Sequence, residues 1–284
     1  MGIGYDTSTP EGWHAALAAL QWQVEMGLAE VIGEVPVNAY DLPERAEWQA
    51  VAAPAVAVAA KPAARAEPQP YVPQISAAER AAAVADAAVA EAVAAAGAAR
   101  SLEALREALA GYEHCELKRG ARNLVFADGR AGARVLVLGE APGREEDLEG
   151  RPFVGAAGQL LDRMFAAIGL SRESPDLERA LYITNVMPWR PPGNRDPSPE
   201  EIAMMRPFVE RHIELAAPEV IVLMGNTPCS ALLGAKGILR LRGTWTEALG
   251  RPVMPMTHPA YLLRNPAAKR EAWADLLEIK ARLG

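Results

Sequence analysis

RVLVLGEAPGREEDLEGRPFVG, residues 134–155, is the most informative segment of this 284-residue chain. It opens with four apolar residues, 135–138, of the kind that form a buried strand. The run breaks at Gly139, and Gly143 in the following turn lets the backbone approach another group closely because it has no side chain. The segment therefore predicts a strand that ends in a loop at the carboxyl edge of a sheet, where open α/β folds bind ligands.

Apolar runs and amphipathic segments alternate through the rest of the C-terminal part. The runs predict strands over 135–138, 181–184, 220–224 and 252–256. Helical patterns lie between and after them, over 156–169, 198–216, 226–234 and 266–283. This alternation is typical of a mostly parallel sheet with helices on both faces. We therefore predict an α/β fold, a three-layer α/β/α sandwich around a mostly parallel four-stranded sheet, with a helical N-terminal extension.

Composition divides the chain into four segments. Residues 1–48 carry an amphipathic helical pattern, which predicts a packing helix or, alternatively, a helix that binds a protein partner. Residues 49–76 are rich in alanine and proline and predict a linker. Alanine dominates 77–110, which predicts helix. Residues 111–284 form the predicted α/β domain.

Charge is distributed unevenly along the chain. The formal net charge is −7, and residues 1–100 contain 12 acidic and 5 basic residues, which leaves 24 of each in 101–284. An acidic chain argues weakly against binding nucleic acid, but the neutral C-terminal part leaves room for a local basic face.

Other global features predict a cytoplasmic protein that is monomeric by default. The chain has no apolar run of about 18 residues, so we expect no membrane span. Its N-terminus lacks the basic and apolar pattern of a secretory signal. Two cysteines are too few for a disulfide framework and fit a reducing compartment.

Three predicted strands end in unusual polar residues. Glu140 follows the first strand within GEAPG, Asn185 follows the second, and His258 follows the last. Each has an ordinary structural explanation when taken alone, as a helix-entry turn, a turn former or a structural histidine. Because a parallel sheet delivers its carboxyl ends to one rim, the combination instead predicts a shared site.

Five segments, in this order, resemble the motifs of the family 4 uracil-DNA glycosylases. They read GEAPGREEDLEGRPFVGAAGQLLD, LYITNVMPWRPPGNRDPSPEEI, VIVLMGNTPCSALLG, ILRLRGTW and MTHPAYLLRNP. The resemblance covers roughly residues 112–283. It implies an enzyme that flips uracil out of DNA and hydrolyses its N-glycosidic bond, so the implied partner is uracil-containing DNA.

The resemblance also implies roles for individual residues. Phe153 matches the aromatic that stacks on the base, and Asn185 matches the amide that reads the edge of uracil. His258 matches the histidine near O2, where negative charge develops as the bond breaks. Gly139 and Ala141 are expected to line the same base pocket.

A carboxylate is expected to orient the attacking water. Glu140 is the first candidate and Glu146 the second. Ala141 stands where better-studied uracil glycosylases carry a water-positioning aspartate, which leaves the choice between them open. Glu145 and Asp147 are equally compatible with a solvated acidic loop.

Two loops are candidates for contacts with DNA. The segment YLLR after His258 matches the loop that enters the duplex, with Tyr261 and Leu262 as the apolar part and Arg264 near phosphate; the alternative is a loop packed on the core. Arg190 and Arg195, in a proline-rich loop, are candidates for phosphate contacts, and a solvated loop is the alternative.

The chain departs from the family at its metal centre. Family 4 enzymes bind a [4Fe–4S] cluster through four cysteines, and the matching positions here are Tyr112, Cys115, Trp189 and Met205. One thiolate cannot hold a cluster that needs four. Apolar packing by the two aromatic rings and the thioether is expected to fill the volume instead, so we predict no cofactor.

The sequence therefore predicts a monofunctional uracil-DNA glycosylase without an iron–sulfur cluster. The alternative is a non-catalytic DNA-binding or repair-partner paralogue that kept the fold. The presence of Glu140, Phe153, Asn185 and His258 favours the enzyme.

Overall fold

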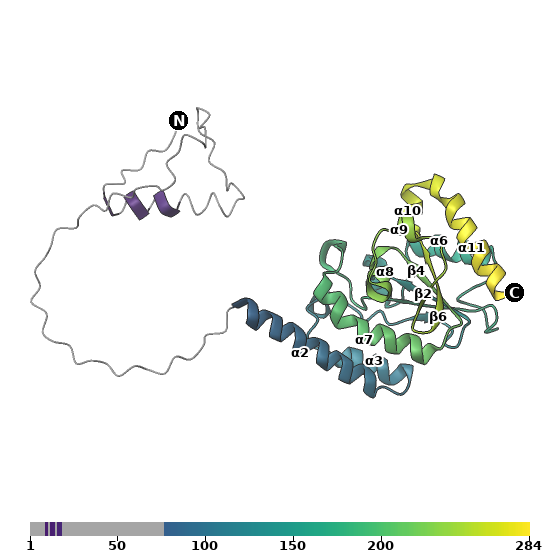
Figure 1. Cartoon of the computed structure of the whole chain (residues 1–284), viewed down its shortest axis with the longest axis horizontal. Helices are drawn as coiled ribbons and strands as arrows, with labels where there is room; N and C mark the ends of the chain where they lie inside the picture. Colours follow the sequence, from purple (N-terminus) through teal and green to yellow (C-terminus); the bar gives the residue numbers. More distant parts are fainter. Residues whose placement is uncertain (1–8, 11, 15, 19–76) are drawn as a thin grey trace, which may run out of the picture. The chain divides into compact units, whose positions relative to one another are not determined.

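The computed structural model describes residues 9–10, 12–14, 16–18 and 77–284 (Figure 1). Helical backbone at 10, 12–14 and 16–18 lies inside the predicted N-terminal helix. The rest of the 1–48 segment and the whole predicted linker, 49–76, lie outside the described residues. No helix in the described part is long and apolar enough to cross a membrane.

The central sheet has the strand order β1-β3-β2-β4-β6-β5. The strands are β1 (Asp128–Gly129), β2 (Val135–Gly139), β3 (Leu181–Asn185), β4 (Val220–Met224), β5 (Thr246–Ala248) and β6 (Arg251–Met256). The inner four, β3-β2-β4-β6, are parallel, as predicted. The expected count of four is wrong, because β1 and β5 add antiparallel edges of two and three residues. Such short strands carry too few residues to show alternation in sequence.

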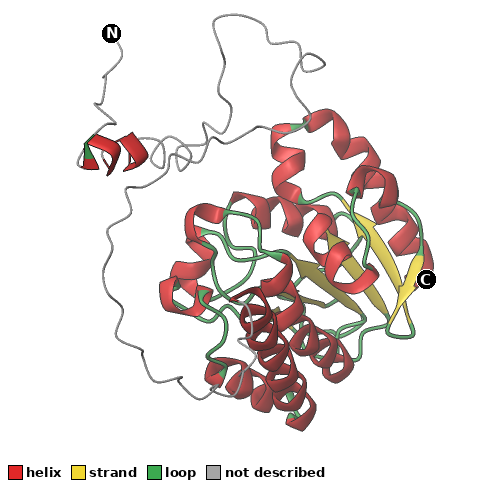
Figure 2. Ribbon diagram, turned by 60° about the vertical axis from the view of Figure 1, so that its left-hand side comes forward, coloured by secondary structure: helices red, strands yellow, loops and turns green. Residues whose placement is uncertain are grey.

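Two hydrophobic layers flank the sheet, because successive strand residues point to opposite faces. In β2, Leu136 and Leu138 pack in one layer, whereas Val135 and Val137 pack in the other. The first layer is covered by α2 (Ala77–Ala98), α3 (Leu102–Gly111), α7 (Pro199–Ala216) and α8 (Asn226–Leu233). The second is covered by α6 (Ala156–Ala166), α10 (Pro259–Arg264) and α11 (Lys269–Leu283). The predicted three-layer sandwich is confirmed, and the helices lie on both sides of the strands in Figure 2.

The connections between these elements contain short helical turns. They are α4 (Leu117–Gly120), α5 (Arg144–Glu149), α9 (Ile238–Leu241) and the 3-10 turns η2 (Pro192–Asn194) and η3 (Pro266–Ala268). The turns α5 and η2 belong to the loops that follow β2 and β3, and α9 follows α8. The turns α5, η2 and α9 therefore lie in segments that follow the carboxyl ends of the parallel strands.

The alanine-rich segment belongs to the same compact unit as the sheet, which takes in the described residues 77–284. Ala92, Ala96 and Ala99 are buried in the first layer, and α2 lies along α7 in Figure 1. Their spacing of three to four residues puts them on one face of the helix. Small side chains therefore let α2 pack closely on the sheet domain, and the division expected at 110/111 stays a prediction.

Candidate functional site

A cleft of about 570 Å³ opens at the carboxyl ends of the parallel strands. Its walls come from the segments that follow β2, β3, β4 and β6. Among the predicted site residues, the cleft is lined by Glu140, Ala141, Glu146, Phe153, Asn185, Arg195, His258, Tyr261 and Arg264. This is the shared rim that the three strand ends predicted.

Asn185 and Phe153 line this cleft, and Gly139, which is not among its lining residues, lies against both side chains. The parallel register pairs Gly139 with Asn185 across β2 and β3. A Cβ atom at Gly139 would clash with both Asn185 Oδ1 and the ring of Phe153. Glycine is therefore required here for the amide and the ring to approach each other, which explains its place at the end of the strand.

The Asn185 side chain has an unused hydrogen-bond acceptor. The residue is 7% exposed, and its Oδ1 is buried without a hydrogen-bond partner among the described residues. A buried polar atom without a partner is costly and unusual in a native protein. The amide is thus suited to a ligand that supplies an N–H donor.

Phe153 has a backbone conformation that is unfavourable for a residue with a side chain, with φ of 54°. Arg172 holds this turn by donating from Nη1 to the carbonyl of Pro152 at 2.8 Å and from Nη2 to the carbonyl of Phe153 at 2.9 Å. Arg172 is itself fixed by ion pairs with Asp128 and Asp162. Strain that surrounding contacts maintain is common in binding sites, and here it orients the ring into the cleft.

Glu146 fixes the same turn from the other side. Its Oε1 accepts from the N–H groups of Val154 and Gly155 at 3.0 Å each, and its Oε2 accepts from Gly143 N at 3.1 Å. Both oxygens are therefore occupied by backbone donors. The carboxylate therefore holds the loop that carries Phe153, and the role of Glu146 toward water stays a prediction.

His258 begins α10 and is poised as a neutral hydrogen-bond donor. Its Nδ1 accepts from Ala260 N at 3.2 Å, so in the neutral ring the proton resides on Nε2. Burial, reinforced by the charge of Arg264, lowers the pKa of His258 to about 4. The ring stacks against Phe153, with centroids 5.5 Å apart. A neutral imidazole can therefore donate Nε2–H to an oxygen in the cleft.

Glu140 lines the cleft with one carboxylate oxygen bonded and the other without a partner among the described residues. Its Oε2 accepts from the Thr227 hydroxyl at 2.5 Å, and no hydrogen bond in the described part of the chain reaches Oε1. Burial raises the pKa of Glu140; the Thr227 hydrogen bond lowers it and nearby Asp196 raises it further. This arrangement suits a group that takes a proton from water.

The two other acidic residues of the loop differ from each other. Glu145 is exposed, as a solvated loop requires. Asp147 is 8% exposed, and its Oδ1 accepts from Arg122 N at 2.8 Å and Asn123 N at 3.2 Å. Asp147 therefore joins two segments of backbone and is neither solvated nor part of the cleft.

The structure corrects one expected DNA contact on α10. Leu262 is 0% exposed and packs in the second layer, where apolar residues of α6 and α11 surround it. Its neighbour Leu263 is 41% exposed, and Tyr261 and Arg264 line the cleft. A helical turn points adjacent residues in different directions, so Leu263, the other leucine of the YLLR segment, is the leucine available to DNA.

The two arginines of the proline-rich loop have internal partners. Arg190 donates to Asn194 Oδ1 at 2.8 Å and lies outside the cleft lining. Arg195 lines the cleft, but its Nη1 and Nη2 donate to Glu201 at 2.8 and 2.6 Å. Its side chain is 47% exposed, so a phosphate would share the guanidinium with Glu201.

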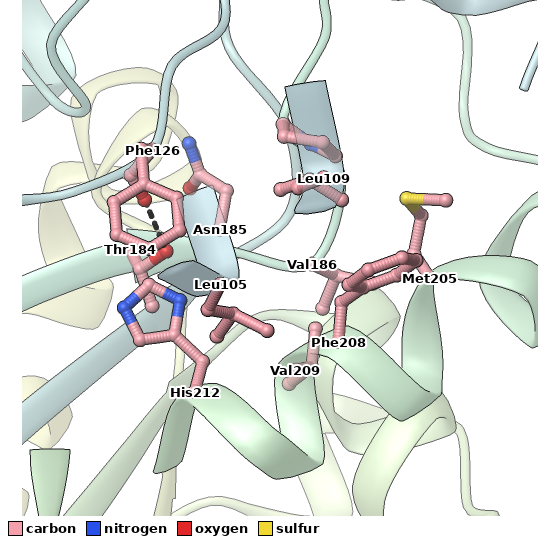
Figure 3. A pocket seen from close by; sticks show the side chains of 11 residues that line it. Leu105, Leu109, Phe126, Thr184, Asn185, Val186, Met205, Phe208, Val209 and His212 are labelled. Carbon is pink, nitrogen blue, oxygen red and sulfur yellow. Dashed lines mark hydrogen bonds between the residues drawn. The ribbon is translucent and has the colours of Figure 1, made fainter. Parts of the chain in front are cut away.

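A second cavity, of about 10 Å³, lies beneath Asn185 and is shown in Figure 3. His212 lines it, accepts or donates a 2.9 Å hydrogen bond with the Tyr182 hydroxyl, and stacks on Phe126. Burial lowers the pKa of His212 to about 4. This volume holds about one water molecule at most, so the cavity supports the floor of the cleft rather than binding a ligand.

The four residues that match the cluster cysteines of the family lie together in the first hydrophobic layer. Tyr112, Cys115, Trp189 and Met205 are each no more than 3% exposed. The Tyr112 hydroxyl donates to the carbonyl of Ala88 at 2.8 Å. Tyr112 thus helps to hold α2 on the domain.

Sequence reasoning missed two polar residues of the cleft, Thr227 and Thr257. Thr227 lies in the GNTPC segment after β4, and Thr257 Oγ1 is buried without a partner among the described residues. The carboxyl end of β4 was the available signal, because β4 lies between β2 and β6 in the sheet. Strand order had to be known before that end could be placed at the centre of the site.

Comparison with known proteins gives one consistent result. Residues 126–277 match the family model of the uracil DNA glycosylase superfamily. The chain is similar to the type-4 uracil-DNA glycosylase of Thermotoga maritima, at 40% identity over 58% of this chain and 84% of the relative. The corresponding protein of Archaeoglobus fulgidus is 38% identical over 63% and 92% of the two chains. The chain belongs to the uracil DNA glycosylase superfamily.

Proposed function

We propose that this protein hydrolyses the N-glycosidic bond of uracil in DNA. The observation that carries the proposal is the convergence of three groups on one cleft of about 570 Å³. They are an amide oxygen without a hydrogen-bond partner among the described residues, an aromatic ring and a neutral imidazole. Base excision needs a pocket that receives an extruded nucleotide, stacks on it and reads its pairing edge. The similarity to type-4 uracil-DNA glycosylases selects uracil among the possible bases.

Each converging group has one role in the proposed pocket. The Asn185 amide accepts N3–H of uracil at Oδ1 and donates from Nδ2 to O4, which uses the acceptor that otherwise has no partner. The Phe153 ring stacks on the base. Gly139 and Ala141 leave room for it, since neither has a side chain beyond a methyl group.

The proposed chemistry places opposite charges at two ends of the breaking bond. As the bond between N1 and C1′ breaks, its electron pair leaves with uracil, and His258 donates Nε2–H to the O2 atom on which negative charge gathers. Water adds to C1′ of the sugar, and Glu140 takes a proton from that water. His258 keeps its proton in this hydrogen bond, so uracil departs as an anion, and the proton held by Glu140 then passes to uracil or to solvent. The products are free uracil and an abasic deoxyribose.

Surface contacts with DNA are proposed for residues at the mouth of the cleft. Leu263 fills the space left by the extruded base, and Tyr261 and Arg264 flank it. Arg195 and Arg190 contact phosphate from the neighbouring loop. The exposure of Leu263 and the position of Arg264 on the cleft wall support this arrangement.

We infer that the protein folds and acts without an iron–sulfur cluster. Burial raises the pKa of the Cys115 thiol, which disfavours the thiolate that iron needs, and the other three positions offer no thiol. Burial raises the pKa of Tyr112 to about 12, so its hydroxyl stays protonated and available to Ala88. These residues do not fit a cluster, and no step of the proposed reaction uses one.

The setting of the reaction is proposed as a monomer in the cytoplasm. The two free cysteines, Cys115 and Cys229, are both buried, which fits a reducing compartment. Binding of a protein partner by residues 1–48 stays a prediction.

The test is release of uracil from single- and double-stranded oligonucleotides that each contain one deoxyuridine. Wild type is expected to release uracil, and Asn185→Ala and His258→Ala are each expected to lose about 100-fold or more in the single-turnover rate. Wild-type release no faster than background, with protein that melts cooperatively, would favour the non-catalytic paralogue.

A further inference from the structure

The Thr227–Glu140 hydrogen bond joins two segments that both line the cleft. Thr227 is the second residue of α8 and is 7% exposed, and Glu140 follows β2. The hydroxyl oxygen and Glu140 Oε2 are 2.5 Å apart. A hydrogen bond to an ionised carboxylate is short and strong, so this distance fits a charged Glu140.

The neighbouring residues fix Thr227 in this role. The preceding residue, Asn226, uses its Oδ1 to accept from Gly237 N at 3.0 Å and Ile238 N at 2.9 Å. Asn226 is therefore engaged away from the carboxylate, and Thr227 supplies the hydroxyl. Because Thr227 is β-branched, its χ1 angle is restricted, which holds the hydroxyl in place.

We propose that Thr227 is a positioning residue that directs Glu140 toward the attacking water, an inference that rests on the proposed glycosylase function. The hydroxyl occupies Oε2 and leaves Oε1 as the oxygen that can accept the proton of water. Without this donor, the carboxylate would turn freely and would meet its desolvation cost with no compensating bond.

Other charged or titratable groups share the cleft with Glu140. The titratable and charged residues that line the same cleft are Glu146, Arg195, Asp196, His258, Tyr261 and Arg264. Among them, Asp196 raises the pKa of Glu140, in the same direction as burial, whereas the Thr227 hydrogen bond opposes both. Removal of the hydroxyl is therefore expected to raise the pKa of Glu140 and to leave more of it protonated and unable to act as a base.

The experiment compares single-turnover uracil release across pH for wild type, Thr227→Val and Thr227→Ser. The valine variant keeps the shape and removes the donor; we expect a rate on the order of tenfold lower at pH 7 and an acidic limb shifted to higher pH, since one pH unit corresponds to a tenfold change in protonation. The serine variant is expected to restore both. Thr246→Val, on an exposed edge strand, is the matched control.

A double-mutant cycle with Glu140→Gln separates positioning from a general structural effect. In the Glu140→Gln background, Thr227→Val is expected to cost much less than in wild type. The proposal is overturned if Thr227→Val has the rate and the acidic limb of wild type. It is also overturned if Thr227→Val lowers the rate by the same factor in wild type and in Glu140→Gln, and leaves the acidic limb of the Glu140-containing protein unmoved. If wild type itself releases no uracil, the proposed function fails and this role fails with it.

A carboxyl-carbon NMR titration gives a readout that does not need activity. The Glu140 resonance, identified by its absence in Glu140→Gln, should titrate at higher pH in Thr227→Val than in wild type. Thr227→Ala serves in place of the valine variant if that protein does not fold. Equal titration of Glu140 with and without the hydroxyl would overturn the proposal.

Discussion

The rings of Phe153 and His258 stack with centroids 5.5 Å apart and an interplanar angle of 28°. The two residues come from different edges of the cleft, one from the loop after α5 and one from the start of α10. Their contact brings the proposed stacking group and the proposed donor to the same small volume. A base that enters the cleft must therefore meet both at once.

Phe153→Ala is expected to lower the single-turnover rate by about 5- to 150-fold, because stacking of a base on an aromatic ring contributes about 1–3 kcal/mol. Phe153→Tyr keeps the ring and should retain most of the activity. Binding of free uracil, measured by inhibition, should weaken in parallel in the alanine variant. An alanine variant with wild-type rate and uracil affinity would rule out the stacking role.

Leu262→Ala and Leu263→Ala are expected to have opposite effects. Removal of the buried Leu262 side chain should destabilise the protein by about 2–5 kcal/mol in urea unfolding, because it leaves a cavity. Leu263→Ala should leave the free energy of unfolding nearly unchanged and reduce excision from duplex DNA more than from single strands, where no base stack has to be filled. Equal loss on both substrates would contradict the wedge assignment.

Glu146→Ala is expected to act through the loop that carries Phe153. The change removes the acceptor of three backbone N–H groups, at Gly143, Val154 and Gly155, so a destabilisation of about 1–3 kcal/mol should accompany a lower rate. The acidic limb of the pH–rate profile should persist, because the proposed mechanism assigns the proton of water to Glu140. Glu145→Ala, at the exposed neighbouring position, is the control.

Glu140→Gln should remove that acidic limb. Burial raises the pKa of Glu140, so wild-type activity should fall as the pH drops through this raised value and the carboxylate becomes protonated. Burial lowers the pKa of His258 to about 4, the opposite direction to Glu140, and His258→Ala in the same pH series separates the two groups. A limb that survives unchanged in Glu140→Gln would assign the water-activating role to another group.

His212 makes stability depend on pH. Burial lowers its pKa in the folded protein to about 4 from an ordinary value of 6.5, so the unfolded chain binds more protons between these limits and the contribution of His212 to stability falls as the pH falls. The stability advantage of wild type over His212→Asn should therefore shrink from pH 7 to pH 5, by up to about 1.4 kcal/mol per pH unit. Urea unfolding at both pH values measures this, and a constant difference would contradict it.

Long, strongly patterned elements could be predicted from sequence, and short ones could not. The four parallel strands lie where apolar runs predicted them, and α7 lies within the helical pattern predicted over 198–216. The edge strands β1 and β5 are stabilised by pairing with distant residues rather than by a local pattern.

The site shows the same limit at the level of single side chains. The positions of Glu140, Asn185 and His258 follow from motifs at strand ends, because a parallel sheet gathers those ends, whereas Phe153 was predicted from the family resemblance. Glu140 and Glu146 differ in their partners, because backbone N–H groups lie within reach of Glu146. Leu262 and Leu263 differ in exposure, because they point in different directions on one helical turn. Neither is visible in the linear sequence.

The most direct measurement pairs uracil release with iron content in the same anaerobically purified protein. The account predicts excision of uracil by protein that contains negligible iron and shows no absorbance near 400 nm, with a rate that does not change when iron and sulfide are supplied. Protein that releases no uracil when iron-free, or whose rate rises in proportion to bound iron, would contradict it.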